Sequence, residues 1–301
     1  MKQQMTIAFI GLGVMGGPMA GHLARVGHHV IPYNRSPNRA TKWQSAWQEE
    51  GLEVRFADTP AQAASGASYV ITCVGNDEDL ASVTTASGGV LEAMEDGALL
   101  IDHTTTSADM ARQLGSTCAS NGIGFVDAPV SGGQAGAENG QLAIMCGGSE
   151  TDMARAQPVM DAYAKAIVHV GETGAGQTAK MANQMCIAGV LGGLSEAVRL
   201  AQGAGIDLEK TYEAISGGAA QSWQMDNRWS TMTADTFDFG FAIDWMRKDL
   251  GYALAEAQRL GLSSPISALV DQFYGEVQAN GGNRLDTSAL VTRLPKSPKP
   301  Q

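Results

Sequence analysis

The chain has 301 residues, 44% of them apolar and 17% charged, and its 31 acidic and 20 basic side chains give a formal net charge of −11. A chain of this length buries a sizeable core and is typical of about two domains. The acidic balance argues against nucleic acid or an anionic membrane as a partner and favours a small anion that is bound locally.

The cysteines and the N-terminus indicate where the protein works. Its four cysteines are scattered, without a C-x-x-C pair or a cluster with histidine: Cys73, Cys118, Cys146 and Cys186. We therefore expect a reduced, cytoplasmic protein without a bound metal. Glycines and a proline interrupt the first apolar run, and the small-residue run 185–194 is too short to span a bilayer, so we expect neither a targeting segment nor a membrane helix.

Short apolar runs alternate with helical patterns in the first half of the chain. The runs that end in polar or glycine-rich loops are expected to be strands: 6–10, 29–33, 69–74, 99–102 and 124–127. A helix is expected over 18–26, and edge strands are expected over 142–146 and 167–170. This alternation predicts a doubly wound, mostly parallel α/β sheet.

After Gly171 the pattern changes to long helices, expected over 177–201, 208–216, 241–260 and 266–279. The sequence thus predicts an α/β domain over 1–170 and an all-α domain over 171–301. The apolar helices of the second domain can bury against another subunit, so we expect a homodimer or a homotetramer.

The first strand is followed by a glycine-rich segment, Gly11-Leu12-Gly13-Val14-Met15-Gly16. Between a strand and a helix, a G-x-G-x-x-G sequence is typical of a dinucleotide site. The first glycine permits the tight turn, the second lets the backbone approach the pyrophosphate, and the third allows close packing of helix on strand. The helix N-terminus adds partial positive charge. An ordinary glycine turn is the alternative.

The type of cofactor depends on the end of the second strand, where an acidic residue would bind the ribose diol of NAD. The chain there reads Asn34-Arg35-Ser36. No acid repels a 2′-phosphate, and the guanidinium of Arg35 and the hydroxyl of Ser36 can donate to one. The sequence therefore predicts NADP, with NAD as the alternative if Arg35 is only a solvated surface charge.

Two further loops follow predicted strands at the edge where a doubly wound sheet binds its ligand. We expect the backbone of Val74 and the hydroxyl of Thr105 to contact the nicotinamide half of the cofactor. A helix N-cap before Ala108 is an equally good interpretation of any one threonine from 104 to 106.

Ser131, Gly132 and Gly133 follow the predicted strand 124–127 and offer a hydroxyl and unobstructed backbone N–H groups. Such groups suit a carboxylate, so we expect a small carboxylate substrate here. A bare Ser-Gly-Gly is also typical of a simple turn.

Lys180 places an ammonium in a helix of small and apolar residues, with Asn183 and Gln184 on the same face. A lysine that snorkels to solvent is the alternative. A hydride-transferring enzyme needs a proton partner, however, and Lys180 is the candidate acid or base. The role of base requires its pKa to lie well below the ordinary value of about 10.4, through desolvation and a nearby like charge.

Four segments occur in register over nearly the whole chain: the glycine loop 11–16, residues 127–133 continued by Gly136-Ala137 and Gly140, Lys180 to Asn183, and Lys248-Asp249-Leu250. Together they resemble the β-hydroxyacid dehydrogenase family, which includes 3-hydroxyisobutyrate dehydrogenase and tartronate semialdehyde reductase. The resemblance implies a Rossmann domain followed by a helical domain. It also implies NAD(P)-linked oxidation of a short 3-hydroxy acid or reduction of its semialdehyde.

The same resemblance implies roles for single residues. Lys180 would be catalytic with Asn183 beside it, the segment Ser131 to Gly133 would bind substrate, and Lys248 would lie near cofactor and substrate. Two departures leave the pocket shape less defined. Gln184 stands where many members have a second asparagine, and His103-Thr104 stands where a smaller pair is common.

Other interpretations remain at this point. Tartronate or succinic semialdehyde could be the substrate of a reductase, and imine reductases are further relatives, although Lys180 argues against them because they usually replace the lysine. From a different class, the chain could be a non-catalytic nucleotide-binding scaffold. The residues that speak against a scaffold, which needs no proton donor, are Gly11, Gly13, Ser131, Lys180 and Lys248.

Overall fold

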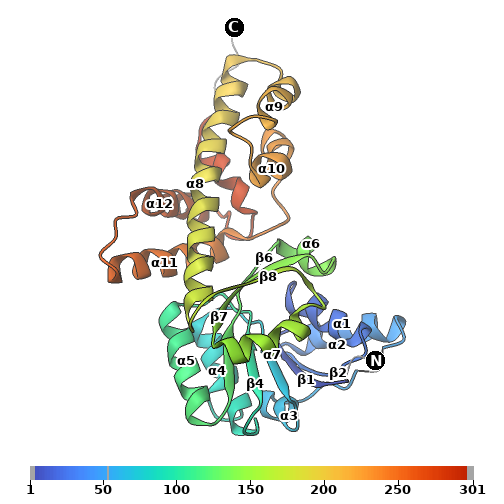
Figure 1. Ribbon diagram of the computed structural model, residues 1–301. Helices are drawn as coiled ribbons and strands as arrows, with labels where there is room; N and C mark the ends of the chain where they lie inside the picture. Colours follow the sequence, from blue (N-terminus) through green and yellow to red (C-terminus); the bar gives the residue numbers. More distant parts are fainter. Residues whose placement is uncertain (1–3, 53, 297–301) are drawn as a thin grey trace. The chain divides into compact units, whose positions relative to one another are not determined.

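The computed structural model describes residues 4–52 and 54–296, and the chain divides into two compact units between Lys180 and Met181. The first unit is an eight-stranded sheet covered by helices, and the second is helical (Figure 1). The prediction of a doubly wound α/β sheet followed by an all-α part is confirmed. The predicted domain boundary at 170/171 falls before the final residue of the last strand, whereas the compact units divide inside a helix.

The sheet has the strand order β2-β1-β3-β4-β5-β7-β6, and β8 pairs with β7. Neighbours from β2 to β5 are parallel, β7 is antiparallel to β5 and β6, and β8 is parallel to β7. The bounds are β1 Thr6–Ile10, β2 His29–Tyr33, β3 Tyr69–Thr72, β4 Leu99–Asp102, β5 Gly124–Asp127, β6 Val130–Ser131, β7 Leu142–Gly148 and β8 Ala164–Gly171. The strand order reverses at β1, where doubly wound sheets bind their ligands.

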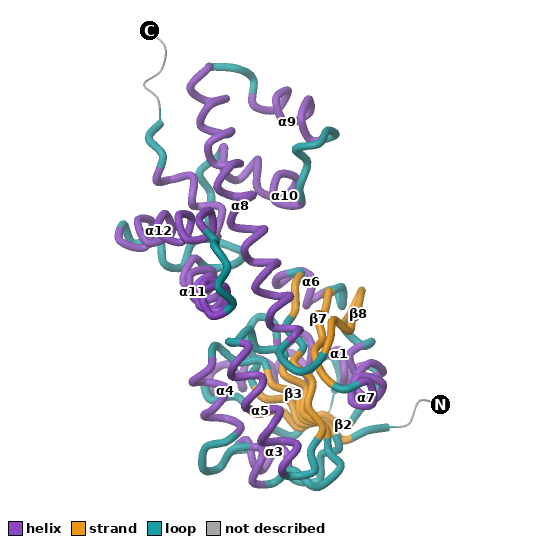
Figure 2. Tube along the Cα trace, turned by 60° about the vertical axis from the view of Figure 1, so that its left-hand side comes forward, coloured by secondary structure: helices purple, strands orange, loops and turns teal. Residues whose placement is uncertain are grey.

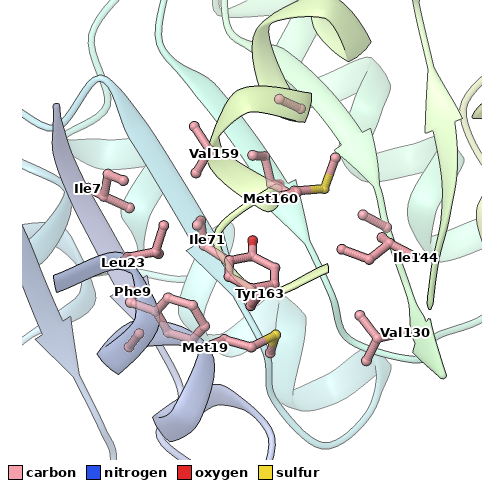
Figure 3. Packing of buried hydrophobic residues seen from close by; sticks show 14 of the residues in the cluster. Ile7, Phe9, Met19, Leu23, Ile71, Val130, Ile144, Val159, Met160 and Tyr163 are labelled. Carbon is pink, nitrogen blue, oxygen red and sulfur yellow. The ribbon is translucent and has the colours of Figure 1, made fainter. Parts of the chain in front are cut away.

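Helices cover both faces of this sheet, because its strands are apolar on both sides. Their bounds are α1 Gly16–Arg25, α2 Pro37–Glu49, α3 Pro60–Ala64, α4 Asp77–Thr84, α5 Ala108–Ser120, α6 Gly133–Glu138 and α7 Glu150–Met160. Figure 2 shows α3, α4 and α5 on one side of the strands and α1 and α7 on the other. Alternate residues of β1 enter opposite cores. Ile7 and Phe9 pack with α1 and α7 (Figure 3), and Ala8 and Ile10 pack with α3, α4 and α5.

The second unit has one core of its own. Helix α8 (Ala175–Ala204) begins in the first unit, and the other helical segments are α9 Leu208–Ser216, α10 Trp223–Thr233, α11 Ile243–Arg259, α12 Pro265–Ala279 and the 3-10 segment η2 Thr287–Arg293. Met246 and Tyr274 are fully buried in this core, and Trp229 is 4% exposed. Across the described ranges 4–52 and 54–296, no helix is both long and apolar enough to cross a membrane.

Several local predictions differ from the structure. The strand predicted over 69–74 ends at Thr72, because Cys73 and Val74 turn into a loop. The strands predicted over 142–146 and 167–170 are longer, and β7 lies inside the sheet between β5 and β6, not at its edge. The sequence analysis predicted no helix at α2, α3, α4, α6, α7 or α10, and it considered α5 only as a helix that would start at Ala108.

Candidate functional site

Four parallel strands end together at one edge of the sheet. The register pairs Ile10 with Thr72, Thr72 with Asp102, and Asp102 with Asp127, each the last residue of its strand. The loops that follow β1, β3 and β4 carry the segment 11–16 and the predicted cofactor residues Val74 and Thr105, and the predicted substrate residue Ser131 ends the short strand β6, which follows β5. The first unit therefore brings these predicted site residues to one edge, where open α/β sheets bind ligands.

The three glycines of the loop 11–16 have different surroundings. Gly11 has a φ of +101°, and a Cβ there would lie 2.3 Å from the carbonyl oxygen of Cys73. A Cβ at Gly16 would lie 2.0 Å from the carbonyl oxygen of Gly11. A Cβ at Gly13 would meet no atom within 4 Å. The chain thus needs Gly11 and Gly16 for its own packing, whereas the open side of Gly13 fits a pyrophosphate that approaches the backbone.

Two side chains hold this loop in place. The backbone N–H of Leu12 donates to Oδ1 of Asn34 at 2.8 Å, and Nε1 of Trp43 donates to the carbonyl oxygen of Leu12 at 3.0 Å. The Asn34 side chain therefore holds the glycine loop in place. Met15 precedes α1 and makes no side-chain cap, while the N–H of Gly17 in the first turn donates to the carbonyl oxygen of Gly13. Val14 is 62% exposed.

Arg35 and Ser36 lie at the surface beyond β2. The Arg35 side chain is 74% exposed, and its Nη1 donates to Oδ1 of Asp79 on α4 at 2.7 Å. Ser36 stands at the N-cap position of α2 without capping it. One nitrogen of the guanidinium is therefore paired with the Asp79 carboxylate, and the other N–H groups of Arg35 can donate to a phosphate.

The loop after β4 places Thr105 between two buried neighbours, Thr104 and Thr106, while Thr105 itself is partly exposed. The hydroxyl of Thr104 accepts from the backbone N–H of Val74 at 3.1 Å, which joins the two loops. The alternative that one of these threonines caps the next helix is wrong. Ser107 is the N-cap of α5, and its hydroxyl accepts from the N–H of Met110.

Lys180 and the loop Ser131 to Gly133 lie together in the first unit. Lys180 is only 7% exposed, and its Nζ donates to the carbonyl oxygen of Val130 at 2.9 Å, one residue before Ser131. Gly132 and Gly133 have φ values of +132° and +63°. The buried Lys180 nitrogen is thus bound to the backbone one residue before Ser131, and a hydroxyl and glycine N–H groups in that segment suit a substrate that has a carboxylate.

Asn183 and Lys248 belong to the second unit, where a hydrogen-bonded chain joins them. Nδ2 of Asn183 donates to Oε1 of Gln184 at 2.8 Å, and Nε2 of Gln184 donates to Oδ2 of Asp249 at 2.7 Å. Nζ of Lys248 lies 3.2 Å from Oδ1 of Asp249 and over the rings of Trp245 and Tyr252. Because Asp249 can only accept, the amide of Gln184 must present its oxygen to Asn183.

Two buried carboxylates end the neighbouring strands β4 and β5. Burial raises the pKa of Asp102 to about 6, although hydrogen bonds from Thr104 and Thr72 act to lower it. Burial likewise raises the pKa of Asp127 to about 7, although the N–H groups of Gly174 and Gln177 donate to it at 2.7 and 2.9 Å. Asp127 thereby fixes the start of α8, the helix that carries Lys180.

The sequence analysis gave no role to Trp43, Asp127 or Gln177, although the last two lie in segments that it singled out. The available sequence signal for Gln177 was a single amide side chain within a run of small residues. Within residues 4–52 and 54–296, no group of three or more histidine, cysteine, aspartate or glutamate side chains is arranged to hold a metal ion.

Comparison with known proteins gives matches over both units. Residues 6–171 match the model of the NAD-binding domain of 6-phosphogluconate dehydrogenase, and residues 174–294 match that of the NAD-binding domain of NADP-dependent 3-hydroxyisobutyrate dehydrogenase.

Relatives of known name align over nearly their full length. The chain is 34% identical to 3-hydroxyisobutyrate dehydrogenase of Pseudomonas aeruginosa, over 94% of this chain and 96% of that protein. It is 34% identical to 2-hydroxy-3-oxopropionate reductase of Escherichia coli, over 96% and 97%. A solved structure of Mycobacterium tuberculosis 3-hydroxyisobutyrate dehydrogenase with L-serine superposes with a TM-score of 0.87 at 32% identity, over 97% of this chain and 99% of that one.

The buried Asp102 predicts a pH dependence of stability. Its folded-state pKa of about 6 lies above the ordinary value of 3.8, so the folded state binds the proton more tightly, and stability present below pH 4 is lost as the pH rises through 6. Asp102→Asn, which mimics the protonated acid, should gain roughly 3 kcal/mol over the wild type between pH 4 and pH 7. Denaturant unfolding at several pH values measures this difference, and parallel curves for the two proteins would contradict it.

The glycine loop predicts opposite effects for two alanine substitutions. Gly13→Ala should fold normally but lose cofactor affinity, because its methyl group would occupy the open side of the loop. Gly16→Ala should lower the melting temperature, because its methyl group would clash with the carbonyl oxygen of Gly11. Thermal unfolding and cofactor fluorescence titration separate the two outcomes. A Gly13→Ala protein that binds cofactor as tightly as the wild type would exclude this site.

Proposed function

The chain belongs to the β-hydroxyacid dehydrogenase family, and we propose that it transfers a hydride between NADP and a short 3-hydroxy acid or its semialdehyde. It is an NAD(P)-dependent oxidoreductase that acts on CH–OH donors. The observation that carries the finer proposal is the buried ammonium of Lys180, held 2.9 Å from the carbonyl oxygen of Val130 beside Ser131. The scaffold alternative is set aside, because a scaffold needs no buried lysine at a ligand edge.

The protein's own groups can carry the proton transfer. The bound nicotinamide supplies or accepts the hydride. In oxidation, neutral Lys180 accepts the hydroxyl proton of the substrate as its carbon loses the hydride. In reduction, the Lys180 ammonium polarises the carbonyl and returns that proton to its oxygen. Ser131 and the N–H groups of Gly132 and Gly133 would hold the carboxylate, so that the reacting carbon has a fixed position.

The substrate class is supported by these groups together with the named relatives. A carboxylate at Ser131 and a hydroxyl near Lys180 would suit a short acid with the hydroxyl on its β-carbon. L-serine, found with the Mycobacterium tuberculosis relative, has this arrangement. The Escherichia coli relative is a reductase of 2-hydroxy-3-oxopropionate, the semialdehyde of tartronate. We therefore keep reduction of tartronate or succinic semialdehyde as the second candidate. Assays of short 3-hydroxy acids and semialdehydes with both cofactors separate them.

The preference for NADP rests on Arg35 and Ser36. Binding of a 2′-phosphate would compete with the ion pair between Arg35 and Asp79. Charge-assisted hydrogen bonds are worth about 1.5–3 kcal/mol, so Arg35→Ala should raise the KM for NADP by about 10- to 100-fold and leave that for NAD nearly unchanged. Asp79→Asn, the matched control, should bind NADP at least as well as the wild type. A wild-type preference for NADH over NADPH would refute this part of the proposal.

The role of Lys180 predicts a separation of turnover from binding. General acid–base groups contribute about 10²- to 10⁴-fold, so Lys180→Ala should lower kcat by that factor while cofactor affinity stays close to that of the wild type. Lys165→Ala, on the exposed face of β8, is the control lysine and should keep full activity. Steady-state kinetics and cofactor titration measure both quantities. Near-normal turnover by Lys180→Ala would remove Lys180 from the mechanism.

A further inference from the structure

We propose that Gln177 is a positioning residue for hydride and proton transfer, because its side chain joins the helix of Lys180 to the loop of Thr105. This inference rests on the proposed function, in which Lys180 moves the proton and the Thr105 loop lies against the nicotinamide. Gln177 is fully buried in the first turn of α8, one helical turn before Lys180.

The amide of Gln177 bonds to the backbone on both sides of Thr105. Its Oε1 accepts from the N–H of Thr106 at 3.1 Å, and its Nε2 donates to the carbonyl oxygen of Thr104 at 2.7 Å. One side chain thus bonds to the carbonyl of Thr104 and to the N–H of Thr106, as the backbone of a neighbouring strand would. Thr105 itself, between these two bonds, keeps a partly exposed side chain.

The chain needs such a partner at this place. The ladder between β4 and β5 ends with the pair Asp102 and Asp127, so the loop that follows has no strand beside it. Thr104 and Thr106 are nevertheless 1% and 0% exposed. Buried backbone groups without hydrogen bonds destabilise the folded state. Gln177 removes that cost and at the same time fixes the course of the loop.

Other hydrogen bonds in this region connect Gln177 to the predicted nicotinamide loops and to the helix that carries Lys180. The backbone N–H of Gln177 donates to Oδ2 of Asp127, which secures the helix to β5. The hydroxyl of Thr104 holds the N–H of Val74, the second predicted nicotinamide contact. Lys180, three residues after Gln177, donates to the carbonyl oxygen of Val130. One amide therefore sets how far the nicotinamide loops lie from the proton-transfer group.

This geometry predicts an effect on the chemical step. A misplacement of about 1 Å can cost about 100-fold in rate. Gln177→Leu, which keeps the volume but neither hydrogen bond, should lower kcat by about 10- to 100-fold with little change in the dissociation constant of NADPH. The primary isotope effect with NADPH deuterated at C4 should rise, since hydride transfer becomes more rate-limiting. Thr178→Ala, whose exposed hydroxyl bonds only to the carbonyl of Gly174 in its own helix, is the control.

Gln177→Glu gives a second readout that a purely structural role would not produce. When protonated, Glu at this position can accept from Thr106 and donate to Thr104 as glutamine does; when ionised, it opposes a carbonyl oxygen. The ratio of its kcat to that of the wild type should therefore fall as the pH rises. Asp102 and His103 at the end of β4, Asp127 on β5 and Lys180 on α8 lie nearby and are present in both proteins, so the wild-type pH profile is the baseline for the ratio.

The outcomes distinguish this inference from the proposed function. Three results with an active wild type would each overturn the positioning role. Gln177→Leu could turn over as fast as the wild type, or it could lose only cofactor affinity. The kcat ratio of Gln177→Glu to the wild type could also be independent of pH. A wild type without turnover on the substrate panel would contradict the proposed function instead. Hydrogen exchange tests the tie without activity. The Thr106 amide should exchange faster in Gln177→Leu than in Thr178→Ala, and equal rates would overturn the tie itself.

Discussion

The buried carboxylate of Asp127 is the contact on which the site depends. It accepts from the N–H groups of Gly174 and Gln177 and so ties the start of α8 to the end of β5. Helix starts leave such N–H groups without partners, and a carboxylate is the acceptor that they favour. Burial raises the pKa of Asp127 to about 7, so this tie is made against a desolvation cost. Removing the helix start from the sheet edge would separate Lys180 from Val130 and Gln177 from the cofactor loop.

The rest of the site consists of loops held rigid before any ligand arrives. Asn34 and Trp43 brace the glycine loop, and Thr104 joins the loops after β3 and β4. Such bracing lowers the cost of ordering the site when ligands bind. The flexible exception is Arg35, an exposed side chain whose ion pair with Asp79 is weak enough to be exchanged for a phosphate.

The sequence predicts best those features whose cause is local. Gly11 and Gly16 are required by their own turn and helix start, and the polarity of Lys180 is visible within one helical run. Partners far apart in the chain were not predictable. Gln177 bonds to Thr104 across 73 residues, and Gln184 to Asp249 across 65. Thr104, Thr105 and Thr106 were alternative candidates for the N-cap of α5, which is Ser107, because adjacent hydroxyls give the same local signal and only the fold selects among them.

The central claim is that Lys180 moves the substrate proton at the carboxyl edge of the sheet. The pH dependence of kcat/KM for oxidation of a 3-hydroxy acid, measured for the wild type and for Lys180→Arg, tests it most directly. The account predicts that the wild-type value rises with pH through one ionisation below the ordinary lysine pKa of about 10.4, and that this ionisation is absent from Lys180→Arg. The same ionisation in both proteins would contradict the account.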